Sequence, residues 1–421
     1  MYKKITLENG LRILLVPDTH TKAVTVMLLV GTGSKYETKD INGISHFLEH
    51  MFFKGTKKRP DKIHISEPVD RVGGMYNAFT GEDYTGYFAK VEKTHFEMAL
   101  DILSDMYLNS TLEQSELERE RGVIIEEINM YYDNPMSYVQ HLWTNLLYGD
   151  QPAGWDIAGT KETVSAITSA IMNEYYKKQY VASNTIAVIS GNFDEAEATA
   201  KIKEYLAPIG TDRFKKKEAV LEKQDKPEIN LHFRETDQTH LCLGFRGYNS
   251  NNPKKYAQEL LATALGGMMS SRMFLKIREE MGLAYYIRTA IDENPDTGCI
   301  ITRAGLDNKR IEPAIKAIIE EYRKIRDEGI SQDELKKAKD NVIGHMTLSM
   351  ESSDALASFY GMQELLEDKI ETPEEYAEMI NKVTPQDIQE VAKDLFKGEK
   401  MNLAIVGPYK DKKVFEGLLK I

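Results

Sequence analysis

Cysteine and long apolar runs are both scarce in this chain of 421 residues. The two cysteines, Cys242 and Cys299, lie far apart and outside any C-x-x-C spacing, so they can build neither a disulfide framework nor a cysteine zinc site. No apolar run approaches about 18 residues, so a membrane span is not expected. Residues 1–7 lead directly into strand-like sequence and leave no room for a signal peptide. We expect a cytoplasmic protein in a reducing compartment.

The chain also lacks a concentrated block of basic residues. Its 66 acidic and 54 basic residues give a formal net charge of -12, which argues against nucleic acid as a partner. Apolar residues make up 42% of the chain and charged residues 29%, which is typical of globular proteins and not of disordered or fibrous ones. The length is sufficient for two domains of about 100 to 200 residues each.

The sequence predicts an internal duplication. Residues 184–191 near the end of the first half resemble residues 402–407 near the end of the second, and the strand-like residues 24–30 and 240–245 precede them at similar distances. The repeat is roughly 215 residues long, which indicates a single duplication and not a solenoid array. The alternative is a coincidental similarity between unrelated domains, which short apolar runs do not exclude.

The predicted domain boundary lies almost at the midpoint, in a lysine-rich stretch with few large apolar residues. We therefore predict an N-terminal domain over 1–211, a linker over 212–226 and a C-terminal domain over 227–421. In both halves, strand runs alternate irregularly with long amphipathic helical patterns, over 96–107, 114–131 and 311–325. The expected fold class is α+β, with each domain a mostly antiparallel sheet flanked by helices.

One predicted helix carries two histidines. Residues 40–53 have helical apolar spacing, with Asp40 as the expected N-cap. His46 and His50 are four residues apart and project from one face of such a helix, close enough for both imidazoles to bind one ion. Glu49 neighbours both. A histidine pair on a helix is otherwise usually a surface pair or a hydrogen-bonded core pair, so the metal hypothesis depends on a third ligand.

The third ligand is expected on a second helix, because a catalytic zinc ion held by two histidines needs one more protein ligand beside its water. At about 100° per residue, residues 116–131 show one apolar stripe, formed by Leu117, Val123, Ile124 and Tyr131. Glu127 and Glu120 fall inside that stripe, whereas Glu126 points outward. A carboxylate on a buried face is costly unless it is paired or bound to metal, so we assign Glu127 as the ligand. We expect Glu120 to lie near the site without touching the ion.

The order H-x-x-E-H is the inverzincin signature, reversed from the common H-E-x-x-H. Residues 43–56 (GISHFLEHMFFKGT) resemble the signature of the pitrilysin, insulinase and mitochondrial processing peptidase family. Counting from His50 by that family's spacing leads to Glu127, the residue that the helix pattern also selects. The resemblance extends over almost the whole chain, and it maps an acidic position of the family onto Glu120.

The resemblance also implies substrate-binding positions in the first half. Residues 77–85 are similar to the edge strand on which this family binds extended peptides, which would add to the sheet through backbone hydrogen bonds. The positions assigned to substrate on this basis are Asn77, Ala78 and Phe79.

In the second half, residues 270–285 resemble the family's arginine and tyrosine motif, which assigns Arg278 and Tyr285 to substrate contact. The resemblance implies that the two domains form a clamshell. In single-length members, the motif of the second half would come from a partner chain. Because this chain carries both motifs, we predict a homodimer with composite active sites.

The predicted activity is that of a zinc-dependent endopeptidase with one zinc ion per chain, acting on peptides or unfolded segments. Zinc would lower the pKa of its bound water to roughly 7 and polarise the scissile carbonyl, while Glu49 acts as general base. One alternative is a non-catalytic structural or assembly subunit of the same fold. Another is a metal-dependent lyase with the same motif, but such lyases are short and use a cysteine ligand, and both cysteines here lie in the second half.

Overall fold

The computed structural model describes residues 2–367 and 369–421. The chain forms two compact units, and each unit draws on both halves of the sequence. Unit 1 consists of residues 1–128, 155–218 and 348–372, and unit 2 of residues 129–154, 219–347 and 373–421. The units thus differ from the predicted linear division at two segments, 129–154 and 348–372, each of which belongs with the opposite half of the sequence.

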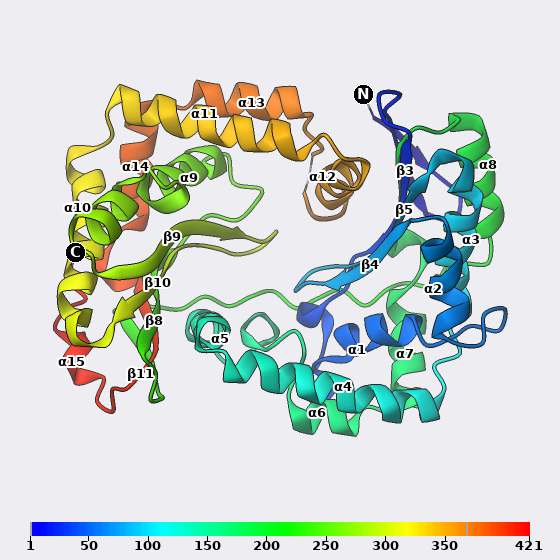
Figure 1. Ribbon diagram of the computed structural model, residues 1–421, viewed down its shortest axis with the longest axis horizontal. Coiled ribbons are helices and arrows are strands. Elements are labelled where there is room, and N and C mark those ends of the chain that lie inside the picture. Colours follow the sequence, from blue (N-terminus) through cyan, green and yellow to red (C-terminus); the bar gives the residue numbers. More distant parts are fainter. Residues whose placement is uncertain (1, 368) are drawn as a thin grey trace. The chain divides into compact units, whose positions relative to one another are not determined.

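A six-stranded mixed sheet forms the centre of unit 1, in the order β1-β2-β6-β3-β5-β4. Figure 1 labels three of its strands, β3, β5 and β4. Neighbouring strands run antiparallel except for the parallel pair β2 and β6. The central strand β3 is apolar except for Thr25, because its alternate side chains enter two cores, one on each face of the sheet. The strands are β1 Lys3–Thr6, β2 Arg12–Pro17, β3 Ala23–Val30, β4 Met75–Thr80, β5 Thr85–Glu92 and β6 Thr185–Gly191.

Helices cover both faces of this sheet. The larger core lies between the sheet and most of the helices of the first half, whereas α12 packs against the other face, on β3 and β6. The helices of the larger core are α1 Ile44–Phe52, α2 Lys62–Arg71, α3 Phe96–Asn109, α4 Gln114–Asp133, α6 Lys161–Ala166, α7 Ser169–Gln179 and α8 Glu195–Tyr205. Helix α12 spans Ser353–Leu366 and contributes Ala357 and Tyr360 to the smaller core.

Unit 2 is built around a five-stranded sheet in the order β7-β11-β8-β10-β9, with β7 and β11 parallel and the other pairs antiparallel. The strands are β7 Glu228–Phe233, β8 Gln238–Arg246, β9 Ala284–Glu293, β10 Gly298–Asp307 and β11 Met401–Gly407. The main core contains side chains from α9 Lys255–Ala262, α10 Ile311–Glu328, α11 Gln332–Ser349, α13 Pro373–Lys382, α14 Pro385–Leu395 and α15 Lys413–Glu416. On the other face lies α5, Pro135–Tyr148, which buries Val139, Trp143 and Leu147 against β8, β10 and β11.

The two units share one topology. In sheet order, strands β2, β6, β3, β5 and β4 of unit 1 correspond to β7, β11, β8, β10 and β9 of unit 2, including the parallel pair at the same place. Each small core is completed by a helix from the other half of the sequence, α12 in unit 1 and α5 in unit 2. The predicted fold class, an α+β chain with two similar, mostly antiparallel sheets flanked by helices, is confirmed.

The three helices predicted over 96–107, 114–131 and 311–325 are confirmed as α3, α4 and α10, each within two or three residues of the predicted ends. Within residues 2–367 and 369–421, no helix is both long and apolar enough to cross a membrane. Cys242 and Cys299 are free thiols buried in unit 2. The cytoplasmic location stays a prediction.

Candidate metal centre

Helix α1 separates its apolar and polar side chains by face. Its apolar members are buried in the core of unit 1 and comprise Ile44, Phe47, Leu48, Met51 and Phe52. His46, Glu49 and His50 project from the remaining face, as a period of 3.6 residues requires. In Figure 1, α1 crosses between the edge strand β4 and the long helix α4. The polar face therefore looks toward the elements that could complete a site.

The predicted N-cap of this helix, Asp40, is wrong. Asp40 lies in a short 3-10 turn, Lys39–Ile41, and accepts a hydrogen bond from the hydroxyl of Thr38. The N-cap is Gly43, with a φ of 95°, and the first-turn N–H groups are satisfied by the buried carboxylate of Glu37. A side chain from an upstream loop replaces the local cap, which the sequence pattern did not reveal.

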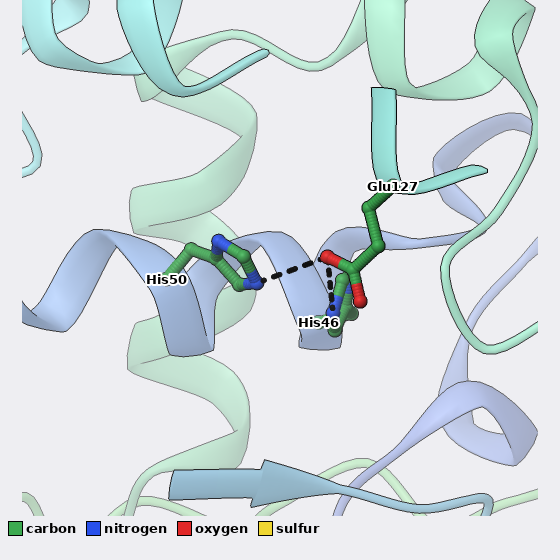
Figure 2. A group of neighbouring side chains, drawn as sticks. All are labelled: His46, His50 and Glu127. Carbon is green, nitrogen blue, oxygen red and sulfur yellow. Dashed lines mark ion pairs between the residues drawn. The ribbon is translucent and has the colours of Figure 1, made fainter. Parts of the chain in front are cut away.

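The side chains of His46, His50 and Glu127 converge on one point in unit 1 (Figure 2). Oε2 of Glu127 lies 3.7 Å from Nε2 of His46 and 3.6 Å from Nε2 of His50, and one ligand atom from each residue lies within 4.8 Å of the others. Tetrahedral zinc with bonds of about 2.0–2.1 Å separates neighbouring ligand atoms by about 3.4 Å. The spacing and the donor types fit a zinc ion.

The protonation state of His46 is the one that a metal ligand requires. Burial, together with the nearby charge of His50, lowers the pKa of His46 to about 4, against the opposing effect of Asp156. At neutral pH the imidazole is therefore uncharged and carries a lone pair, which is the form that binds metal ions. This is the state that a two-histidine, one-carboxylate site needs.

Glu120 lies beside His50. Its Oε1 is 2.8 Å from Nδ1 of His50, and its other oxygen forms an ion pair with Lys54. Burial alone would raise the pKa of Glu120, but the hydrogen bonds from His50 and Lys54 outweigh it and hold that pKa below its usual value. A charged acceptor on Nδ1 fixes the tautomer that leaves Nε2 of His50 free to face Glu127. The position is the one predicted, near the three side chains without being one of them.

Helix α4 presents a narrower buried stripe than predicted. Leu117, Glu120 and Ile124 are buried, whereas Val123 is 52% exposed and Tyr131 is 39% exposed. The prediction for these last two is wrong. Val123 sits at the border of the stripe, and Tyr131 lies beyond Ile128, where the chain leaves unit 1. Glu127 nevertheless lies on the side of α4 that faces α1, one turn after Ile124.

Glu49 occupies the same face of α1 as the histidines without joining the three-residue group. Its Oε2 accepts a hydrogen bond from the hydroxyl of Thr80, at the end of β4. Burial raises the pKa of the Glu49 carboxyl, and the charge of Glu127 adds to this, while the hydrogen bond from Thr80 and the charge of His50 oppose it. A carboxylate that holds a proton more readily than usual is suited to accept and return one.

The predicted substrate strand is an edge strand. Among the described strands of the unit 1 sheet, β4 pairs only with β5, with Asn77 opposite Phe88 and Ala78 opposite Tyr87. Asn77 is exposed, and its side-chain oxygen accepts a hydrogen bond from the N–H of Ala78. Ala78 and Phe79 are half-buried. Such an edge can accept an added strand, so the geometry is compatible with the predicted role.

Arg278 and Tyr285 belong to unit 2, and the three-residue group belongs to unit 1. The guanidinium of Arg278 lies 4.7 Å from the centre of the Phe274 ring, and Tyr285 is 60% exposed at the start of β9. Both side chains are thus accessible. Their contact with substrate stays a prediction.

Three residues of this region were not assigned a role from the sequence, namely Glu37, Lys54 and Thr80. Lys54 was within reach of sequence reasoning, because it lies only two residues beyond the end of α1 and close to His50 in the sequence. Thr80 and Glu37 carry no such signal. They meet α1 only through the folding of a hairpin and a loop onto it.

Replacing Glu120 with glutamine should weaken zinc binding by about 10- to 100-fold, because Nδ1 of His50 loses its charged acceptor. Competition with a chromophoric chelator measures the dissociation constant. Glu118→Gln is a matched control, since Glu118 is exposed on the same helix and pairs with Arg121. Equal zinc affinities of the two variants would contradict the role of Glu120.

Two family profiles match the sequence. The profile described as Insulinase (Peptidase family M16) matches residues 12–161, and the profile described as Peptidase M16 inactive domain matches residues 166–342. The chain is 36% identical to the uncharacterized zinc protease YmxG of Bacillus subtilis, over 97% of this chain and 98% of the relative. It is 32% identical to an uncharacterized zinc protease of Streptomyces coelicolor, over 97% of this chain and 90% of the relative.

Solved structures share the fold. A protease from Helicobacter pylori has a TM-score of 0.91 at 23% identity, with 97% of this chain and 100% of that chain covered. A protein from Pseudomonas fluorescens described as a peptidase M16 inactive domain has a TM-score of 0.90 at 19% identity, with 97% of this chain and 98% of that chain covered. These likenesses support the two-domain α+β fold independently of the site.

Proposed function

Because the chain belongs to the M16 (insulinase) peptidase family, we propose that it is a zinc-dependent endopeptidase that cleaves peptides and unfolded segments. The observation that carries the proposal is the convergence of His46, His50 and Glu127 on one point beside Glu49. The family assignment agrees with the resemblance predicted from the H-x-x-E-H segment. The matched relatives are named zinc proteases, which supports zinc as the ion.

His46, His50 and Glu127 would hold the zinc ion. When bound, the ion would supply Lewis-acid polarisation of the scissile carbonyl and would acidify a water molecule. Glu49 accepts the proton of the attacking water and returns it to the nitrogen of the leaving amine, so that no covalent intermediate with the protein is needed. Thr80 holds the Glu49 carboxylate by its hydrogen bond, and Glu120 holds the ring of His50.

The substrate would bind in extended form along the free edge of β4. Its backbone would form hydrogen bonds with the edge at Ala78, whose N–H and C=O groups point away from β5, and side chains at alternate positions would set the cleavage preference. A folded protein does not offer a free extended segment of this kind. Flexible peptides are therefore the proposed substrates.

The proposed activity is tested with a library of internally quenched peptides. Hydrolysis should fall to background when a chelator strips the protein, and it should return when stoichiometric zinc is added, because the attacking water depends on the ion. Mass spectrometry of the products would then give the cleavage preference. Zinc binding without hydrolysis of any peptide in the library would favour the non-catalytic subunit, and hydrolysis that survives complete metal removal would contradict the proposal.

We also propose that two copies of the chain share their active sites, because the metal motif and the Arg278 motif lie in one sequence. Mixing a Glu49→Gln chain with an Arg278→Ala chain should then restore up to about a quarter of the wild-type activity. In a dimer with shared sites, each site takes its metal motif from one chain and its Arg278 motif from the other. After random mixing, only some sites receive both motifs intact. Activity is measured after co-refolding or co-expression, with each variant alone as control. No restoration in a mixture shown to contain heterodimers would argue against shared sites.

A further inference from the structure

The N-terminus of α1 is held by a buried carboxylate from an upstream loop. Glu37 is 3% exposed. Its Oε2 accepts hydrogen bonds from the N–H of Gly43 at 2.8 Å and the amide of Asn42 at 2.9 Å, and its Oε1 accepts from the N–H of Ser45 at 2.9 Å. The first N–H groups of a helix have no partner within the helix, so Glu37 supplies acceptors for two N–H groups at the start of α1. Its carboxylate also places a negative charge at the positive end of the helix dipole.

A second set of contacts fixes the same turn from the other side. Gly43 has a φ of 95°, and a β-carbon there would lie 2.6 Å from the carbonyl oxygen of Ala158, so the backbone approaches closely at this point. The Asn42 amide also donates to the carbonyl of Asp156. The hydroxyl of Ser45 lies 2.8 Å from that of Tyr175. Within unit 1, the start of α1 is therefore clamped on more than one side.

The position of the His46 side chain depends on this turn more than the position of the His50 side chain does. With Gly43 as N-cap, His46 is the third residue of the helix and lies in its first turn. Nδ1 of His50 is held by Glu120, whereas Nδ1 of His46 is buried with no hydrogen-bond partner among the residues that the structure describes. No hydrogen bond on Nδ1 thus fixes the His46 ring, whose direction is set by the backbone that carries it and by its edge-on contact with the ring of His50, at a centroid distance of 4.6 Å.

Keeping a carboxylate in this place is costly. Burial disfavours the charged form and raises the pKa of Glu37 to about 7, which the hydrogen bonds from Ser45, Asn42 and Gly43 only partly counter. An uncharged side chain at the same place would avoid that cost. A glutamine, however, has one acceptor oxygen and would direct its NH2 group at a backbone N–H, so it cannot accept from Gly43 and Ser45 in the same way.

We propose that Glu37 is a positioning residue for the metal centre: its carboxylate fixes the first turn of α1 and thereby sets the place of His46 relative to Glu127. The inference rests on the proposed zinc site and adds a residue that touches neither the ion nor its ligands. Loss of the clamp lets the first turn fray or shift along the helix axis. His50, in the last turn, is affected less.

The test compares Glu37→Gln with wild type in two properties that do not depend on turnover. Zinc affinity is measured by competition with a chromophoric chelator, and the visible spectrum of the cobalt-substituted protein reports the ligand geometry. Glu37→Gln should weaken zinc binding about ten-fold and should change the position or intensity of the cobalt bands. Glu321→Gln is the matched control, because Glu321 is also a buried carboxylate, 5% exposed, but lies in unit 2 and pairs with Lys324.

The control should lose stability in thermal unfolding while keeping the wild-type zinc affinity and cobalt spectrum. If Glu37→Gln also keeps both, the positioning role is excluded, whatever its melting temperature. Glu37→Asp, which retains two acceptor oxygens at shorter reach, should lie between wild type and Glu37→Gln, and it replaces the glutamine variant if that protein does not fold. A folded Glu37→Asp protein with wild-type affinity and spectrum would then overturn the proposal. A wild-type protein that binds no zinc would remove the proposed metal centre itself, which is a different result.

Discussion

Replacement of Glu49 by glutamine should reduce peptide hydrolysis by at least about 100- to 10,000-fold and leave zinc binding unchanged. The side chain keeps its size and its place on α1, but the amide cannot accept the proton of the attacking water. Glu49 lies outside the group of His46, His50 and Glu127, so its loss removes no ligand. The hydroxyl of Thr80 can still donate to the amide oxygen, which keeps the side chain in position.

Two measurements are needed for this variant, kcat with a quenched peptide and the zinc content of the same preparation. Glu126→Gln serves as control, because Glu126 is exposed on α4 beside the site and should behave as wild type in both. Substantial turnover by metal-replete Glu49→Gln protein would exclude Glu49 as general base. Loss of zinc from that protein would instead indicate that Glu49 helps to hold the ion.

Replacement of Glu127 by alanine should have the second large effect, a loss of zinc affinity of more than about 100-fold. Partners that only orient a ligand already change metal affinity by about 10- to 100-fold, and Glu127 is placed as a ligand itself. Its oxygen lies 3.7 Å and 3.6 Å from the two imidazole nitrogens, so its removal leaves only those two donors. Hydrolysis should fall in parallel and should recover in part at high zinc concentration.

The two adjacent glutamates provide an internal comparison. Glu126→Ala should retain the wild-type dissociation constant, because Glu126 points to solvent, one position along the helix from Glu127. Chelator competition on the two variants measures the difference directly. If both variants bind zinc as tightly as wild type, the third ligand is not on α4 and the assignment of Glu127 is wrong.

Much of the site follows from local geometry. His46, Glu49 and His50 share a face because residues three and four apart lie together on any α-helix, and the apolar residues between them fix which face is buried. The approach of Glu127 could be predicted from its place on the same face as the buried residues of a second helix, although Val123 and Tyr131 proved to be exposed. The contacts of Glu37 and Thr80 could not be predicted in this way, because a loop and a hairpin bring them to α1 from outside the helix.

The fold, like the site, has some features that follow from local sequence patterns and others that depend on contacts between distant segments. The alternation of strands and amphipathic helices, and the repetition of that order, are periodic properties of the chain and were readable as α+β with a duplication. Periodicity shows that one side of α5 and one side of α12 must be buried, but it does not show against which sheet. The structure places each of them on the sheet of the opposite half.

The sequence by itself thus determined the elements, their repeated order and the side chains available on each helix face, since these depend on spacing along the backbone. Only the tertiary structure decided which sheet each crossing helix covers, which side chain caps α1 and which hydroxyl meets Glu49. Those choices depend on contacts between segments far apart in the chain, where the free energy of burial and hydrogen bonding is gained only after the segments have come together.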